Sequence, residues 1–159
     1  MALEPIFDDQ AGNVIALLDE RLVIQTRSVL LTTAALHVTN RFLLEHVWKP
    51  PFGILAVVNG DAGILPEDVR LVQREFVRRM LDGGAYMCAV VLGDTVHAST
   101  MRSMGRMLLL RQPRLAHFTD VASAAAQLAV PLSLAAADIV AAVDVVQRGG
   151  LPLLAEEAR

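Results

Sequence analysis

The sequence predicts an α/β domain: a mixed, mainly parallel sheet with an N-terminal hairpin and helices packed on it, plus an extra C-terminal helix. Short apolar runs rich in β-favouring residues alternate with longer segments of helical spacing. Only Asp19–Arg21 separates the first two runs, which favours an antiparallel hairpin. Each later run is followed by a segment long enough for a helix, which indicates parallel strands joined by right-handed crossovers.

The same pattern divides the chain into three regions. A length of 159 residues with 54% hydrophobic residues fits one globular domain with a substantial core. We expect an acidic, irregular N-terminus over 1–12, the α/β domain over 13–130, and a C-terminal helix and tail over 131–159.

The first half of the chain is expected to form the hairpin, one helix and one buried strand. Apolar residues in 14–18 and 22–26 supply the two hairpin strands. A helix from about residue 32 to 47 follows, because apolar residues recur there at helical spacing: Leu31, Ala35, Val38 and Phe42. The proline pair after Lys49 ends it. The run GILAVVNG, at 53–60, then predicts a buried strand.

The second half repeats the unit of strand and helix. Pro66 suits the first position of a helix that reaches about Leu81, and 85–93 is the next buried strand. A third helix is expected from near Ser99 to just before Pro113. The remaining elements are a short strand at 115–118, a helix capped by Asp120 that reaches about Ala129, and a last helix capped by Ser133 that reaches about Arg148.

Composition excludes several classes of protein. The net charge of −3 gives no reason to expect a nucleic-acid partner. Cys88 is the only cysteine, so no disulfide can form within the chain and a reducing compartment is expected. The N-terminus lacks the features of a signal peptide, and the apolar stretches are shorter than the roughly 20 residues of a membrane span. We therefore expect a cytoplasmic protein.

The stretch VVLGDTVHASTMRSMGRM holds the first candidate site. If a helix begins near Ser99, its free backbone N–H groups and Arg102, one turn further on, can hold a phosphate or carboxylate. Together with His97 and the Asp61 loop they define a ligand pocket at the strand ends. The plainer alternative is that Ser99 or Thr95 caps the helix and the arginines are solvated.

The sequence gives no sign of catalysis or of a metal. Asp94, His97 and Ser99 are neighbours on one segment, whereas a nucleophile, its base and the orienting acid usually come from separate parts of a chain. No G-x-S-x-G motif occurs. Histidines are dispersed without metal-ligand spacing: His37, His46, His97 and His117. We expect neither an enzyme nor a cofactor.

Arginines define the second candidate site, a surface for a protein partner. Arg70, Arg74 and Arg78 recur every fourth residue and share one helical face, and Arg102 and Arg106 do the same on the next helix. Such a stripe is commonly a solvated face, but arginine is also favoured at interfaces. We expect a partner surface formed by these arginines, with Asp61 at its rim.

The order of the elements resembles that of STAS domains, the fold of anti-sigma-factor antagonists. The stretch LVIQTRSVLLTTAALHVTNRFLL resembles the start of that fold. The later runs PEDVRLVQREFVRRM, CAVVLG and HASTMRSMGRMLLLRQPRLAHFTD resemble uncharacterised bacterial STAS-like proteins, which often carry an arginine-serine step, here Arg102-Ser103. The resemblance covers roughly Asn13 to Ala129.

This resemblance implies a non-enzymatic regulatory module that binds a regulatory protein partner. Related domains that bind lipids or small ligands imply an alternative, a pocket for a small ligand, lipid or anion. In the family, a serine after the strand that corresponds to GILAVVNG is phosphorylated. Here that step reads NGDAGILPED, without serine or threonine, so no phosphorylation site is carried over. Asp61 lies near that position.

The helix after Pro131 lies outside the resemblance. Its apolar stripe must be buried, by default on its own domain and alternatively on a second copy of the chain, which would make a homodimer. The stripe consists of Leu134, Ile139, Val140, Val143 and Val146.

Overall fold

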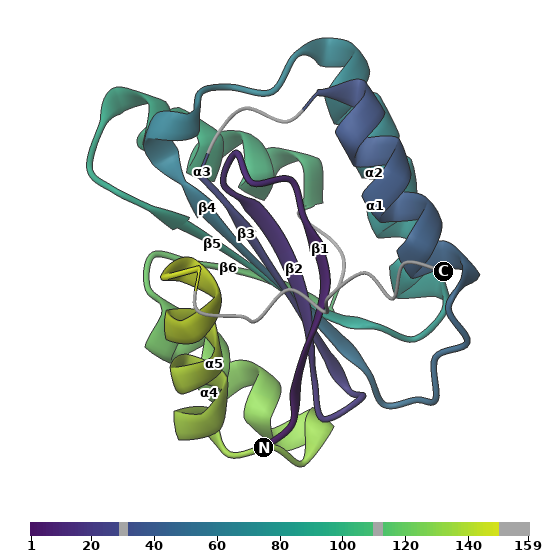
Figure 1. Cartoon of the computed structure of the whole chain (residues 1–159). Coiled ribbons are helices and arrows are strands. Elements are labelled where there is room, and N and C mark those ends of the chain that lie inside the picture. Colours follow the sequence, from purple (N-terminus) through teal and green to yellow (C-terminus); the bar gives the residue numbers. More distant parts are fainter. Residues whose placement is uncertain (29–31, 110–112, 150–159) are drawn as a thin grey trace.

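A computed structural model describes residues 1–28, 32–109 and 113–149, with the backbone alone at 62 and 106–109. Within this part of the chain, six strands form one sheet in the order β1-β2-β3-β4-β5-β6. The pairs β1–β2 and β2–β3 are antiparallel, and every later pair is parallel. The predicted α/β class, with an antiparallel start and a mainly parallel remainder, is confirmed (Figure 1).

Strands and helices alternate from β3 onward. The strands are β1 (Leu3–Asp8), β2 (Asn13–Leu18), β3 (Leu22–Arg27), β4 (Gly53–Asn59), β5 (Tyr86–Leu92) and β6 (Leu115–Phe118). The helices are α1 (Thr33–Glu45), the short 3-10 helix η1 (Gly60–Ala62), α2 (Glu67–Asp82), α3 (Val96–Leu109), α4 (Val121–Leu132) and α5 (Ala136–Gln147).

The N-terminus differs from the irregular segment expected over 1–12. Leu3–Asp8 forms the edge strand β1, which pairs with β2 and has an irregular register between Pro5 and Phe7. Proline and acidic residues weaken a strand pattern, but an edge strand tolerates proline because one row of its backbone groups needs no partner. The prediction of an irregular segment was therefore wrong.

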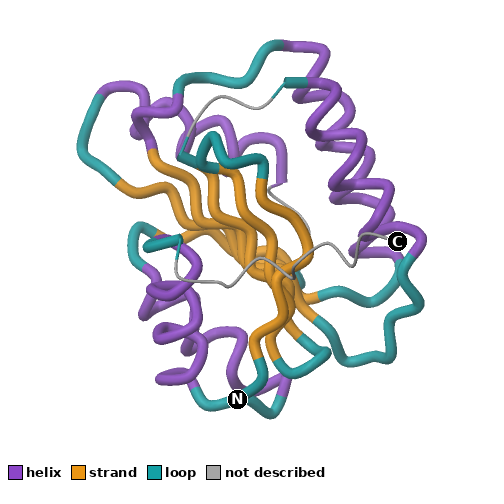
Figure 2. Tube along the Cα trace, in the orientation of Figure 1, coloured by secondary structure: helices purple, strands orange, loops and turns teal. Residues whose placement is uncertain are grey.

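Helices cover both faces of the twisted sheet (Figure 2). On one face, α4 and α5 bury side chains such as Ile24, Leu55 and Val90. On the other face, α1 and α2 bury Val23 and Ile54. Successive strand residues alternate between the two clusters, as the period of a strand requires. α3 lies on the same face as α1 and α2, since it shares a groove with α2.

The C-terminal helix belongs to the domain. Ile139, Val143 and Val146 are buried in the core that α4 and α5 form with the sheet, and Leu134 and Val140 pack against it partly buried. The stripe therefore packs on its own domain, which was the default expectation, and the homodimer alternative stays a prediction.

One predicted helix cap was wrong. Ser133 does not start α5; it ends α4 in the left-handed conformation, and α5 begins at Ala136. The helix before it continues through Pro131 to Leu132, although we expected it to end near Ala129. Among the described helices, none is long and apolar enough to cross a membrane.

Candidate functional site

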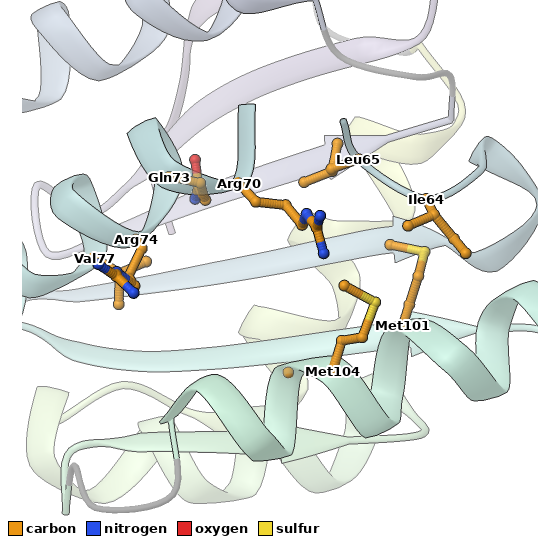
Figure 3. A pocket seen from close by; sticks show the side chains of 9 residues that line it. Ile64, Leu65, Arg70, Gln73, Arg74, Val77, Met101 and Met104 are labelled. Atoms are coloured by element: carbon orange, nitrogen blue, oxygen red, sulfur yellow. The ribbon is translucent and has the colours of Figure 1, made fainter. Parts of the chain in front are cut away.

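A groove opens between α2 and α3 on the sheet face that these helices cover (Figure 3). Its cavity has a volume of about 150 Å³. We call it the α2–α3 groove. The lining is apolar apart from three polar side chains, and consists of Ile64, Leu65, Arg70, Gln73, Arg74, Val77, Met101, Met104 and Gly105.

Two arginines give the groove its charge. Arg70 and Arg74 are one turn apart on α2, and neither forms an ion pair with any described residue. Figure 3 shows the Arg70 guanidinium reaching from α2 into the space towards Met101. The Nε atom of Arg70 and the Oε1 atom of Gln73 are buried without a hydrogen-bond partner among the described residues. The groove therefore combines two arginines that form no ion pair with described residues and walls that are otherwise mostly apolar.

Close backbone contacts place α3 on the sheet. A Cβ atom added to Gly60 would overlap the Ala98 side chain and lie 2.5 Å from the Leu92 carbonyl oxygen. A Cβ atom on Gly105 would lie 2.8 Å from Cε1 of His117. The absence of a side chain at Gly60 thus lets the start of α3 lie close to the end of β5, and at Gly105 it leaves room for the His117 side chain of β6.

The remaining predicted partner residues play different parts. Arg78 is exposed and pairs with Glu75 at 2.8 Å; its hydrogen bond lowers the pKa of that carboxyl group. Nη1 of Arg102 donates to the carbonyl oxygens of Val91 and Gly93, at 3.1 and 2.8 Å. That guanidinium thus fixes the turn before α3, which its spacing could not reveal. The Arg106 side chain lies outside the described residues.

The residues of the pocket expected at the strand ends lie at an exposed helix start, and that pocket stays a prediction. α3 begins at Val96, earlier than expected, and Thr95 caps it by accepting from the Ala98 N–H. Ser99 therefore lies inside the first turn, and its side chain is exposed, as are those of His97 and Asp61. These findings favour the plainer alternative of a capped helix start.

The described side chains of Asp94, His97 and Ser99 do not form a catalytic arrangement. Asp94, His97 and Ser99 are all exposed, and no hydrogen bond joins them. Burial raises the pKa of the Cys88 thiol to about 12, so this group is not a nucleophile at neutral pH. No three His, Cys, Asp or Glu residues of the described ranges are grouped so that they could hold a metal ion.

The structure also buries polar residues that the sequence analysis did not single out. Asn13 of β2, Gln25 of β3 and Asn40 of α1 are buried. Arg27, at the end of β3, lies opposite Asn13 and donates from Nη2 to Oε1 of Gln25 at 3.1 Å. The available signal was Gln25, a polar residue inside the apolar run LVIQTR.

No protein-family model, curated protein or solved structure matches this chain.

Proposed function

We propose that this chain is a non-catalytic binding module that holds a protein partner in the α2–α3 groove. The partner presents an acidic side chain next to apolar ones. The observation that carries the proposal is the pair Arg70 and Arg74, which lack an acidic partner among the described residues and line an otherwise apolar groove. Arginine beside exposed apolar surface is the composition that protein interfaces favour.

The size of the groove favours an anchoring side chain over a whole small ligand. Its volume of about 150 Å³ is smaller than the roughly 300–1,000 Å³ of typical small-molecule sites. One or two side chains fit such a space, and the rest of a protein partner would then lie across α2 and α3.

The resemblance to STAS domains supports a regulatory role. Such a module acts by binding, which agrees with a groove that carries charge but no nucleophile. A cytoplasmic location and a regulatory protein as partner are part of this proposal. Asp61, exposed on η1, would lie at the rim of the interface.

The test is capture of partners from an extract of the cells that produce the chain, quantified by mass spectrometry. Arg74→Glu reverses one charge of the groove at an exposed position. Arg41→Glu is the matched control, because Arg41 is exposed on α1 and contacts Glu45. A protein that both wild type and the control retain should be depleted at least tenfold by Arg74→Glu. Equal recovery by all three would overturn the proposal.

A further inference from the structure

A second groove lies between α1 and α2. These helices run side by side in the same direction, because each connects two parallel strands (Figure 1). At their first turns, Oγ1 of Thr33 donates to Oδ2 of Asp68 at 3.0 Å. The groove has a volume of about 660 Å³, within the roughly 300–1,000 Å³ of typical small-molecule sites. We call it the α1–α2 groove. The α2 residues that line it differ from those that line the α2–α3 groove.

Asn40 places an unpaired amide in the wall of this groove. The residue is 5% exposed, and neither its Oδ1 nor its Nδ2 atom has a hydrogen-bond partner among the described residues. Its neighbours on the buried face of α1, Leu36 and Leu43, are apolar. Leaving buried polar groups unpaired costs about 1–3 kcal/mol each, so the Asn40 amide calls for an occupant that can both donate and accept.

A cation lies one turn further along the groove. Arg79 and Leu44 line both the α1–α2 groove and an adjoining cavity of about 300 Å³. Leu44 follows Asn40 by one turn of α1, about 6 Å along the helix axis. Arg79 is exposed and forms no ion pair with a described carboxylate, while the two glutamates that line the groove each pair with another arginine. Arg79 is therefore available to an anion.

Apolar side chains lie beside these two polar groups. Phe76 of α2 is 2% exposed, and Leu44 and Val72 are partly buried. A ligand that fits the α1–α2 groove must therefore combine three features: an amide, an anionic group about one helical turn away from it, and an apolar body between them.

We propose that the α1–α2 groove binds a small carboxylic acid built on an apolar ring that carries a primary or cyclic amide. Such amides present an N–H and a carbonyl oxygen on one edge, as the Asn40 side chain does. The ligand N–H donates to Oδ1 of Asn40, and the ligand carbonyl oxygen accepts from Nδ2. The carboxylate pairs with Arg79, and the ring lies against Phe76 and Val72. The site is separate from the α2–α3 groove and does not depend on the function proposed for it.

The test uses three probes with the same ring and the intact chain. Terephthalate monoamide carries both an amide and a carboxylate, benzamide lacks the carboxylate, and benzoate lacks the amide. Trp48 is the only tryptophan and lines the adjoining cavity with Arg79, so its fluorescence reports binding. We expect terephthalate monoamide to bind saturably, with a dissociation constant at least tenfold lower than those of the other two. Equilibrium dialysis detects binding that leaves the fluorescence unchanged.

Variants assign the binding to Asn40 and Arg79. Arg79→Gln should remove the preference for terephthalate monoamide over benzamide, and Asn40→Leu should remove its preference over benzoate. Arg148→Gln is the matched control, because Arg148 is an exposed arginine that follows α5 on the opposite face of the sheet, and it should leave both preferences unchanged.

The exposed position of Arg79 keeps the proposal testable even if Asn40→Leu does not fold. No saturable binding of terephthalate monoamide, equal affinity for the three probes, or an unchanged preference in Arg79→Gln would overturn the proposal. Ordered water would then be the partner of the Asn40 amide.

Discussion

At the scale of single residues, the buried polar side chains are the least expected feature of the molecule. The sequence suggested a sheet buried beneath helices. Because strand residues alternate between the two faces of a sheet, apolar residues were expected on both faces of β3. Gln25 and Arg27, two polar residues on one face of β3, break that rule. Local rules of this kind tend to fail at functional sites, because a sequence selected for stability alone would place apolar residues there.

Removing the charge of Arg27 should stabilise the folded protein. Burial lowers the pKa of this group to about 10, well below the ordinary value of arginine, so at neutral pH the folded state bears the cost of keeping it charged. We expect Arg27→Met to raise the free energy of unfolding, measured in urea, by on the order of 1–2 kcal/mol after loss of the bond to Gln25.

The pH dependence of that gain has a defined sign. Above about pH 10, and up to the ordinary pKa of arginine, the unfolded chain binds more protons at this residue than the folded one, so the wild type gains stability as pH rises. The advantage of Arg27→Met should therefore be complete at pH 7 and shrink above pH 10. A variant less stable than the wild type at pH 7 would show that interactions in the folded protein offset the cost of burying the Arg27 charge.

Gly60 should be irreplaceable even by alanine. The added Cβ atom would overlap the Ala98 side chain, where α3 begins its close approach to the sheet. Overpacking of this kind costs about 1–3 kcal/mol. The free energy of unfolding of Gly60→Ala, measured in urea, should therefore be lower than that of the wild type by at least about 1 kcal/mol. Gly83→Ala is the control, because its Cβ atom would come no closer than 3.4 Å to another atom. Equal stability of the two variants would contradict the packing described here.

At the scale of elements, most helices and strands could be predicted from apolar spacing and breakers. The positions of β2, β3, β4, β5, α1 and α2 follow the sequence closely. The existence of β1 and the first residue of α3 depended instead on contacts that apolar spacing does not show. β1 pairs at an edge where its proline is tolerated, and α3 starts at Val96 because Thr95, rather than Ser99, caps it. Caps compete when several hydroxyl residues are adjacent, and the sequence alone does not decide between them.

The cap of α4 gives an element-scale prediction with a pH dependence. Oδ1 of Asp120 accepts from the Ser123 N–H at 2.7 Å. This hydrogen bond is the main reason why the pKa of the Asp120 carboxyl group is lowered. The cap is therefore complete above the ordinary pKa of aspartate and is lost as pH falls through the lower folded value.

Asp120→Ala should consequently unfold at a lower temperature than the wild type at pH 7. The difference between the two midpoints should narrow towards pH 2, where the wild-type carboxylate is protonated as well. Circular dichroism across this pH range provides the measurement. A difference that stays constant with pH would mean that the carboxylate charge contributes nothing to the cap.

At the scale of the whole molecule, the sequence could place the arginines on helices but not the space between the helices. Arg70 and Arg74 were expected to lie on one face, and they line the groove. Arg102 was assigned to the same surface, yet it binds backbone carbonyls before α3. Helical spacing fixes which residues share a face, whereas the partner of a long side chain depends on tertiary contacts that spacing does not contain.

The central claim is that α2 and α3 together form the binding surface. Its most direct test is amide hydrogen exchange of the chain alone and with the partner captured through Arg74. We expect slower exchange over α2 (Glu67–Asp82) and α3 (Val96–Leu109), and no change over α4 and α5 on the opposite face. Protection confined to α4 and α5, with α2 and α3 unchanged, would contradict it.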